Sequence, residues 1–308
     1  MGAWCRRRDH RGGARTAVTP PEAAAFIDIA DARATRSLTG TAGEEIVWRR
    51  FGHGPPLVLL HGGFGSWLHW LPVVALLEPH FQLMIPDMPG FGGSAPIPVG
   101  TTPGRLAEQL AAGLDALLPS GSRLDLAGFS FGGLVATHLA KRLDGRVGTL
   151  ALVAGGGLGA ERDPVDLRGR RPDMSEDERR EVAAHNLRAF MIADATRVDA
   201  LAVEIQQRNT SRRPGLVSRD FSRSRTALAL LPELDARVAA IWGTQDPTVG
   251  GRLADRRRAV EAAARSAMTA ELPGCGHWIM QERPAELAAF LIDAMKPDQP
   301  AGQKGWNT

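Results

Sequence analysis

The chain has 308 residues, with 37 Lys and Arg against 34 Asp and Glu, which gives a formal net charge of +3 at pH 7. Its basic clusters are short and interleaved with acidic residues, so they do not form the continuous basic face that nucleic-acid binding needs. Two cysteines, Cys5 and Cys275, exclude a disulfide framework, and we expect Cys275 to be a buried, inert thiol. Because the sequence contains no C-x-x-C or H-E-x-x-H pair, we expect no metal ion and no other cofactor.

The first residues carry the basic run Arg6–Arg8, and no apolar stretch follows it, which is not typical of a secretory signal. No run in the chain approaches the ~18 apolar residues of a membrane span. We therefore expect a soluble, cytoplasmic protein that acts on a small molecule and binds neither membrane nor nucleic acid. Residues 1–20 and 297–308 are predicted to be disordered tails. The sequence leaves the oligomeric state open.

Short apolar runs alternate with helical patterns between about residues 45 and 155. A helix is predicted over Pro103–Leu118, where leucines recur at spacings of three and four. Strands are predicted at Ile46–Trp48, Leu57–Leu60, Leu83–Ile85, Leu124–Ala127 and Leu150–Val153. This alternation indicates an α/β fold with a doubly wound, mostly parallel sheet.

Residues 156–232 interrupt this alternation, because they contain no strand pattern. Helices are predicted at Ser175–Ala193, which opens with a capping-box pattern, and at Val198–Gln207, followed by a Ser/Arg-rich link over 211–225. Strands resume at Val238–Trp242 and Met268–Leu272. We therefore predict one core domain, formed by residues 21–155 and 233–296, with a helical insertion at 156–232.

A G-x-S-x-G motif, Gly128 to Gly132, lies between a strand pattern and a helix pattern. A serine on so tight a strand-to-helix turn adopts strained backbone angles and needs small neighbours. The following helix directs its unpaired N–H groups at any negative charge that forms near the serine. Ser130 is therefore a candidate nucleophile, and the alternative is an ordinary Gly/Ser turn.

A nucleophilic serine needs a base and an acid that orients it. Of the eight histidines, only His185 and His277 lie well past the helix that follows Ser130. His277 occupies a glycine-rich loop after a strand, whereas His185 lies in a charged helical segment and is interpreted as a surface residue. Asp246 follows the apolar strand Val238–Trp242 and is the candidate acid.

An apolar strand also runs into His61-Gly62-Gly63 upstream of the serine. Such H-G-G turns present backbone N–H groups that form half of an oxyanion hole, and the N–H of Phe131 would form the other half. Each such donor is worth ~3 kcal/mol of transition-state stabilisation. The alternative is a generic turn at a strand end. His61 itself is interpreted as structural, with its ring bonded to loop backbone.

A fourth segment, Asp87–Ser94, reads D-x-P-G-x-G-x-S after a short strand. With His61–Trp67, Gly128–Gly133 and the downstream acid and histidine in the same order, the chain resembles the α/β-hydrolase fold family over roughly residues 45–295. The resemblance implies an architectural role for Asp87 and a lid role for the insertion. It further implies Ser130 as nucleophile, His277 as general base and then acid, Asp246 as the group that holds the imidazole tautomer, and the N–H groups of Gly63 and Phe131 as oxyanion donors.

A second glycine cluster, Gly155–Ala160, satisfies G-x-G-x-x-A. A dinucleotide site needs a helix at once and then a strand that bears an acid, whereas Pro164 and an arginine-rich stretch follow here. We therefore reject nucleotide binding and expect the cluster to let the chain leave the sheet for the insertion.

The sequence predicts a serine hydrolase that cleaves a small, moderately apolar ester through an acyl-enzyme. Serine in place of aspartate at position 130 argues against epoxide hydrolases and haloalkane dehalogenases. An alternative is a carbon–carbon hydrolase of vinylogous diketo acids, because the H-G-G turn and His277-Trp278 resemble meta-cleavage-product hydrolases. In that case Arg188 or Arg208 is a candidate to hold a substrate carboxylate. A cofactor-free lyase or perhydrolase and a non-catalytic interaction protein are further alternatives.

Overall fold

The computed structural model describes residues 18–159, 164–211, 216 and 218–296. The predicted tail 297–308 and residues 1–17 of the other predicted tail lie outside the described residues. Within the described part, Thr19 caps helix α2 (Pro20–Arg33) through a capping box with Glu22. No helix of the described residues is long and apolar enough to cross a membrane.

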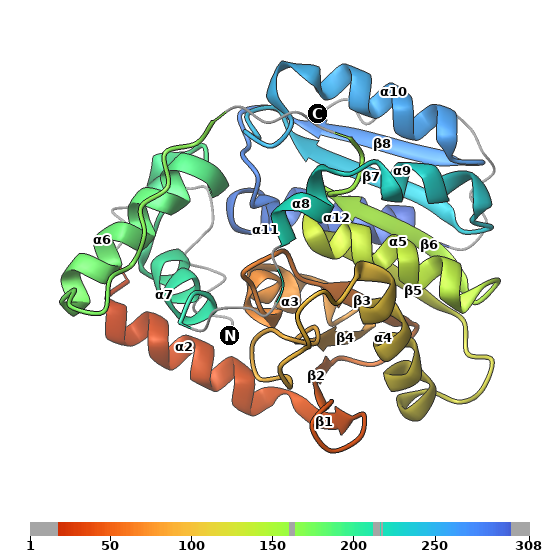
Figure 1. Cartoon of the computed structure of the whole chain (residues 1–308), viewed down its shortest axis with the longest axis horizontal. Coiled ribbons are helices and arrows are strands. Elements are labelled where there is room, and N and C mark those ends of the chain that lie inside the picture. The colour runs from red at the N-terminus through yellow and green to blue at the C-terminus, as the bar shows by residue number, and fades with distance from the viewer. Residues whose placement is uncertain (1–17, 160–163, 212–215, 217, 297–308) are drawn as a thin grey trace.

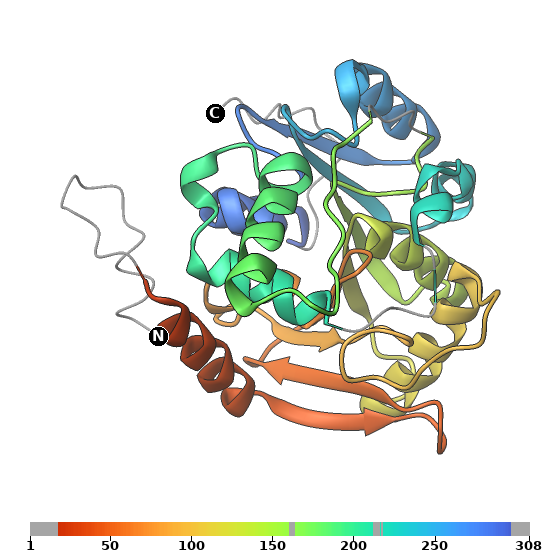
Figure 2. The same ribbon diagram turned by 60° about the vertical axis from the view of Figure 1, so that its left-hand side comes forward.

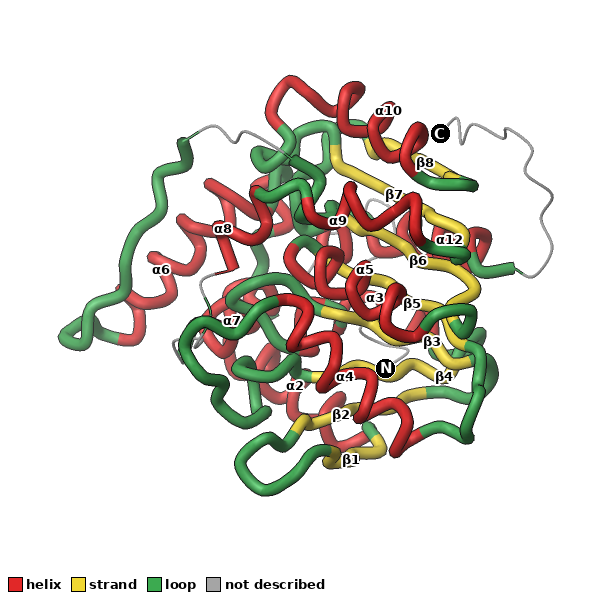
Figure 3. The backbone as a smooth tube through the Cα atoms, turned by 45° about the vertical axis from the view of Figure 1, so that its right-hand side comes forward, coloured by secondary structure: helices red, strands yellow, loops and turns green. Residues whose placement is uncertain are grey.

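Eight strands form one sheet in the order β1-β2-β4-β3-β5-β6-β7-β8. The first two pairings of this order, β1 with β2 and β2 with β4, are antiparallel, and all the others are parallel. Figure 3 shows the strands as one twisted row with β1 and β8 at its edges. The strands are β1 (Thr35–Thr39), β2 (Ile46–Phe51), β3 (Pro56–Leu60), β4 (Gln82–Pro86), β5 (Leu124–Phe129), β6 (Val147–Val153), β7 (Arg237–Gly243) and β8 (Ala267–Leu272). The predicted α/β class is confirmed, and β1 is the strand that the sequence analysis did not predict.

Helices cover both faces of the sheet, so the central strands are buried on both sides. In β3, Leu57 and Leu59 belong to one apolar core, while Val58 and Leu60 belong to the other, because successive side chains of a strand point to opposite faces. The first core is completed by α2, α3 (Leu71–Leu77) and α12 (Pro284–Ala294), and the second by α4 (Pro103–Leu117), α5 (Phe131–Leu143) and α10 (Leu253–Ala263). Short helices η1 (Trp67–His69), η5 (Gly250–Arg252) and α11 (Ile279–Glu282) lie in the connections.

The segment between β6 and β7 is helical. Its elements are α6 (Glu176–Asn186), the π-helical turn η2 (Leu187–Met191), η3 (Ala195–Arg197), α7 (Ala200–Asn209), α8 (Ser218–Arg223), α9 (Thr226–Leu230) and η4 (Leu231–Glu233). Figures 1 and 2 show α6 and α7 beside α2 at one end of the molecule, whereas α8 and α9 lie over α5. Ser175 and Glu178 form the predicted capping box.

Two predicted elements of this segment differ from the structure. The first helix ends at Asn186, not at Ala193, because η2 changes the hydrogen-bond pattern there. The predicted Ser/Arg-rich link contains α8, a six-residue helix whose serines and arginines give no apolar spacing to read. The predicted domain boundaries and the lid role of the insertion stay predictions.

Candidate active site

Ser130 lies at the sharp turn between β5 and α5. Its backbone has φ 51° and ψ −118°, in the positive-φ region that side chains disfavour. The turn is fixed by hydrogen bonds, since Ser130 N–H donates to Val153 O (3.0 Å) and Ser130 O accepts N–H groups from Gly133 (2.9 Å) and Gly156 (2.8 Å). A Cβ on Gly128 would overlap the Gly132 carbonyl, so these tight backbone contacts require glycine.

The H-G-G turn that follows β3 lies against this elbow. A Cβ on Gly62 would lie 3.4 Å from the Ser130 Cβ, and one on Gly63 would lie 3.8 Å from the Phe131 Cβ. Phe131 is the first residue of α5, where helical N–H groups have no intrahelical acceptor. Within the described part of the chain, neither the Gly63 N–H nor the Phe131 N–H donates a hydrogen bond. Both predicted oxyanion donors are therefore free beside Ser130.

Two buried histidines hold the H-G-G turn. His61 Nε2 accepts the N–H of Met88 (2.9 Å), so Nδ1 carries the proton and donates to Gly62 O (2.8 Å). The predicted structural role of the His61 ring is the one seen. His69 Nδ1 accepts the Gly62 N–H (3.2 Å). Burial, reinforced by the charges of His61 and His277, holds the pKa of His69 well below its ordinary value, so this ring stays neutral and can accept.

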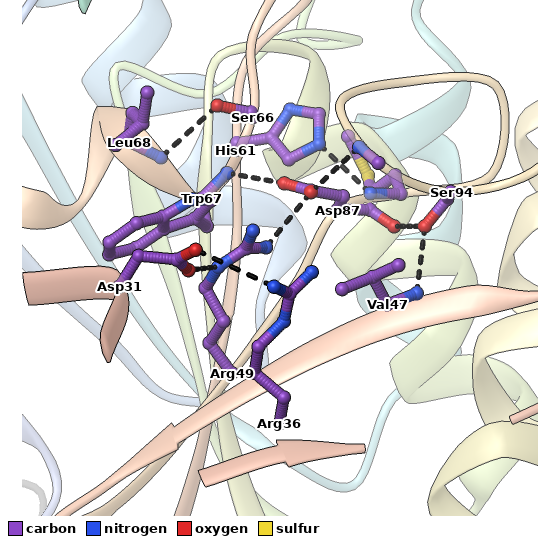
Figure 4. Close-up of polar contacts among 12 residues, drawn as sticks. Asp31, Arg36, Val47, Arg49, His61, Ser66, Trp67, Leu68, Asp87 and Ser94 are labelled. Carbon is purple, nitrogen blue, oxygen red and sulfur yellow. Dashed lines mark hydrogen bonds and ion pairs between the residues drawn. The ribbon is translucent and has the colours of Figure 1, made fainter. Parts of the chain in front are cut away.

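Asp87 ties the H-G-G loop to the loop after β4, as Figure 4 shows. Its Oδ1 accepts the Trp67 N–H, and its Oδ2 accepts the Gly93 N–H and Arg49 Nη1, each at 2.9 Å. The side chains of Asp87 and Arg49 are only 2% and 8% exposed, and the Arg49 guanidinium also pairs with Asp31. These contacts connect two loops with strand β2 and helix α2, which is the architectural role expected for Asp87.

Asp246 and His277 form a buried pair. Asp246 follows β7 and His277 precedes α11, and His277 Nδ1 lies 2.7 Å from Asp246 Oδ2. Burial by itself raises the pKa of the Asp246 carboxyl, but the charge of His277 and hydrogen bonds from His277 and Thr248 outweigh it, so the pKa lies below its ordinary value. An ionised Asp246 keeps the proton of His277 on Nδ1 and leaves Nε2 as an acceptor.

The insertion helps to build the His277 loop. The Trp278 N–H donates to Met191 O (2.7 Å), and the Phe190 ring lies 5.4 Å from the His277 ring. Glu282 joins the two segments, because its carboxylate accepts the N–H groups of Gly276 (2.9 Å) and Ala193 (2.8 Å). The orientation of His277 therefore depends on residues of η2 and of the turn after it.

The predicted site residues do not all meet through hydrogen bonds. Asp246 and His277 are paired, and Gly63 and Phe131 adjoin Ser130. The His277 ring packs 5.0 Å from the ring of Phe129, the residue before the serine. In the described chain, Ser130 Oγ makes no hydrogen bond with His277. Their assignment as a catalytic triad stays a prediction.

Several other predicted residues have partners of their own. The His185 side chain is 22% exposed, and its Nε2 lies 3.0 Å from Asp166 O in a solvent-exposed contact. Arg188 pairs with Glu181 (3.6 Å), and Arg208 pairs with Asp28 (2.8 Å) and Glu204 (2.9 Å). Cys275 is buried and free, and burial raises the pKa of its thiol, as expected for an inert group. Among the described residues, no cluster of three or more His, Cys, Asp or Glu could hold a metal ion.

Residues 57–290 match the sequence profile of the Alpha/beta hydrolase family, which is more than half of the chain. The chain belongs to the α/β-hydrolase family. The family predicted from the sequence motifs is confirmed, and with it the assignment to a family of hydrolase enzymes.

Relatives and solved structures agree with this assignment. A pimeloyl-[acyl-carrier protein] methyl ester esterase from Vibrio campbellii is 40% identical over 108 residues, which are 35% of this chain and 39% of that protein. The chain thus spans about two fifths of the length of the curated relatives it matches. The esterase RhEst1 from Rhodococcus sp. is 25% identical, with a TM-score of 0.67 over 86% of this chain and 100% of that chain. A meta-cleavage product hydrolase from Pseudomonas fluorescens IP01 shares the fold, with 21% identity and a TM-score of 0.65 over 83% of this chain and 96% of that chain.

Sequence reasoning missed one residue that shapes this hydrolase site. His69 links two loops, because its ring accepts the Gly62 N–H and its carbonyl accepts Nε1–H of Trp278 (3.0 Å). No sequence signal marks it, since the bond to Trp278 depends on how two loops 209 residues apart in the sequence meet in the fold.

Proposed function

We propose that this hydrolase is a serine esterase that cleaves a small, moderately apolar carboxylic ester through an acyl-enzyme on Ser130. The observation that carries the proposal is the buried Asp246–His277 pair, whose imidazole packs 5.0 Å from the ring of Phe129, the residue before the strained Ser130. Two relatives named as esterases support the ester bond as the target, one by sequence and one by fold at 25% identity.

The first half-reaction forms the acyl-enzyme. Ser130 Oγ bonds to the ester carbonyl carbon while its proton passes to Nε2 of His277, and the π electron pair of the carbonyl moves to its oxygen. The N–H groups of Gly63 and Phe131 stabilise that oxyanion, at ~3 kcal/mol for each donor. The oxyanion then collapses, the bond to the alcohol oxygen breaks, and His277 returns the proton to the leaving alcohol.

The second half-reaction repeats these steps with water as the nucleophile and Ser130 as the leaving group. Throughout, Asp246 keeps the Nδ1 proton in place and stabilises the imidazolium that forms at each proton transfer. General base catalysis of this kind contributes roughly 10²- to 10⁴-fold. We further propose that the insertion at 156–232 acts as a lid, because η2 packs its Phe190 ring near His277.

The carbon–carbon hydrolase alternative has less support from the structure. It needs a cationic group to bind the carboxylate of a diketo acid. Arg208 is already neutralised by two carboxylates and Arg188 by one. The likeness to the meta-cleavage product hydrolase extends to the fold alone.

An activity panel tests the proposal. It compares p-nitrophenyl esters of increasing acyl length, a methyl ester carried on an acyl-carrier protein, and a dienoate diketo acid, with Ser130→Ala beside the wild type. Ser122→Ala is the matched control, since Ser122 precedes the same strand whose other end bears Ser130 and its hydroxyl bonds only to Pro119 O. We expect short esters to be cleaved and Ser130→Ala alone to be inactive. Exclusive turnover of the diketo acid, or unchanged ester turnover by Ser130→Ala, would overturn the proposal.

A further inference from the structure

Ser218, the first residue of α8, lies directly against the H-G-G turn. A Cβ on Gly63 would overlap Ser218 Oγ and lie 2.9 Å from the Ser218 Cβ. The same point lies 3.8 Å from the Phe131 Cβ. The hydroxyl of a residue in the insertion therefore packs against Gly63, which itself adjoins Phe131.

Ser218 is a buried residue, and the described part of the chain makes no use of its hydroxyl. The residue is 5% exposed, and Ser218 Oγ has no hydrogen-bond partner among the residues that the structure describes. A hydroxyl that no protein group engages is free to donate to an oxygen atom of a bound substrate.

The glycine cluster after β6 fixes α8 in this place. The Gly157 N–H donates to Ser222 O (2.8 Å), and the Gly156 N–H donates to Ser130 O (2.8 Å). A Cβ on Gly156 would lie 3.2 Å from both Ser130 O and the Ser222 Cβ. A larger residue at position 156 would push α8 away from the elbow by a few tenths of an ångström. The cluster that resembles a nucleotide-binding pattern thus positions α8. A nucleotide site would need a helix to begin at once, and none begins within the described part of the cluster, residues 155–159.

We propose that Ser218 donates a third hydrogen bond to the oxyanion, an inference that rests on the proposed esterase function. When Ser130 Oγ bonds to the carbonyl carbon, the π electron pair moves to the carbonyl oxygen, which then accepts N–H bonds from Gly63 and Phe131 and the O–H bond from Ser218. The Ser218 proton is shared in this bond and is not transferred. A donor to a charge that exists only in the transition state raises kcat and leaves KM nearly unchanged.

The test compares Ser218→Ala with Ser224→Ala, a serine that follows the last residue of the same helix and whose hydroxyl meets that of Thr226. We expect Ser218→Ala to lower kcat on p-nitrophenyl butyrate by about 10²-fold, with KM within about twofold of wild type, while Ser224→Ala stays near wild type. A trifluoromethyl alkyl ketone, which forms a tetrahedral oxyanion adduct with the serine, should lose affinity in parallel with kcat. The methyl ketone of equal chain length should not.

Three results would overturn the inference. They are an unchanged kcat in Ser218→Ala, a loss confined to KM, and an equal loss of affinity for both ketones, which would indicate a packing role. These results require an active wild type, so they leave the esterase proposal intact. A wild type that neither cleaves esters nor binds the trifluoromethyl ketone would overturn both proposals together.

Discussion

Replacing Asp87 by Asn changes one atom of a carboxylate that is buried between the H-G-G loop and the loop after β4. The amide can keep its oxygen on the Trp67 N–H. Its NH₂ group would then face the Gly93 N–H and Arg49 Nη1, which both donate to Asp87 Oδ2 at 2.9 Å. A buried donor on Arg49 and a part-buried one on Gly93 would thus lose their acceptor and meet another donor.

The size of the effect follows from this geometry. An unsatisfied buried donor is unfavourable by about 1–3 kcal/mol, and removal of one partner from a buried ion pair costs about 3–5 kcal/mol. Because Arg49 keeps its contact with Asp31, we expect the free energy of unfolding of Asp87→Asn to fall by about 3 kcal/mol.

Asp31→Asn is the matched control, since Asp31 pairs with the same guanidinium but its side chain is 30% exposed. Pairs with such a partner contribute about 0–1 kcal/mol. The assay is urea unfolding followed by tryptophan fluorescence, with the midpoint shift read at constant m-value. If Asp87→Asn loses less than about 1 kcal/mol, or no more than Asp31→Asn, the reasoning about this network is refuted.

The remaining predictions concern the acid, the elbow and the buried rings. In Asp246→Asn, the amide oxygen should keep the Thr248 N–H bond, while the amide NH₂ donates to Nδ1 of His277. The proton of His277 then lies on Nε2, and we expect kcat to fall by about 10⁴-fold. A loss below about tenfold in steady-state ester turnover would contradict the tautomer argument. Gly128→Ala should lower the melting temperature sharply or prevent folding, because its Cβ overlaps the Gly132 carbonyl, whereas Gly169→Ala, with open space around it, should melt like wild type. The pKa values of His61 and His69 are lowered mainly by burial, so below about pH 6.5 the unfolded chain binds protons that the folded chain does not, and stability falls as pH falls, by up to about 1.4 kcal/mol per pH unit for each ring. Urea midpoints that stay constant from about pH 7.5 to about pH 5 would contradict this.

The inner strands β3 to β7 were predictable because both of their faces are buried, which makes each one a mainly apolar run. The edge strand β1 was not. It pairs on one side only, its Leu38 is 68% exposed, and its sequence is mainly polar. Helix α2 was not predicted either, because the three residues that it buries are two alanines and a single large side chain, Ile27.

The residues of the candidate site also divide into those that the sequence predicts and those that it does not. Ser130, Asp246 and His277 could be proposed from the sequence because each follows a recognisable strand in the order of the family. The contact of Ser218 with Gly63 could not, since it arises where a six-residue helix without apolar spacing packs on the elbow. Local sequence patterns therefore predict the candidate triad residues, whereas the contacts of the insertion with the site depend on tertiary packing that no local pattern reveals.

The central claim is that Ser130 is a nucleophile activated by His277. Incubation with a fluorophosphonate, followed by intact-mass and peptide analysis, tests it without knowledge of the substrate. We expect one adduct per chain on Ser130 in the wild type and in Ser122→Ala, no adduct in Ser130→Ala, and much slower labelling in His277→Ala. Labelling that persists in Ser130→Ala, or that proceeds at the wild-type rate in His277→Ala, would contradict the account.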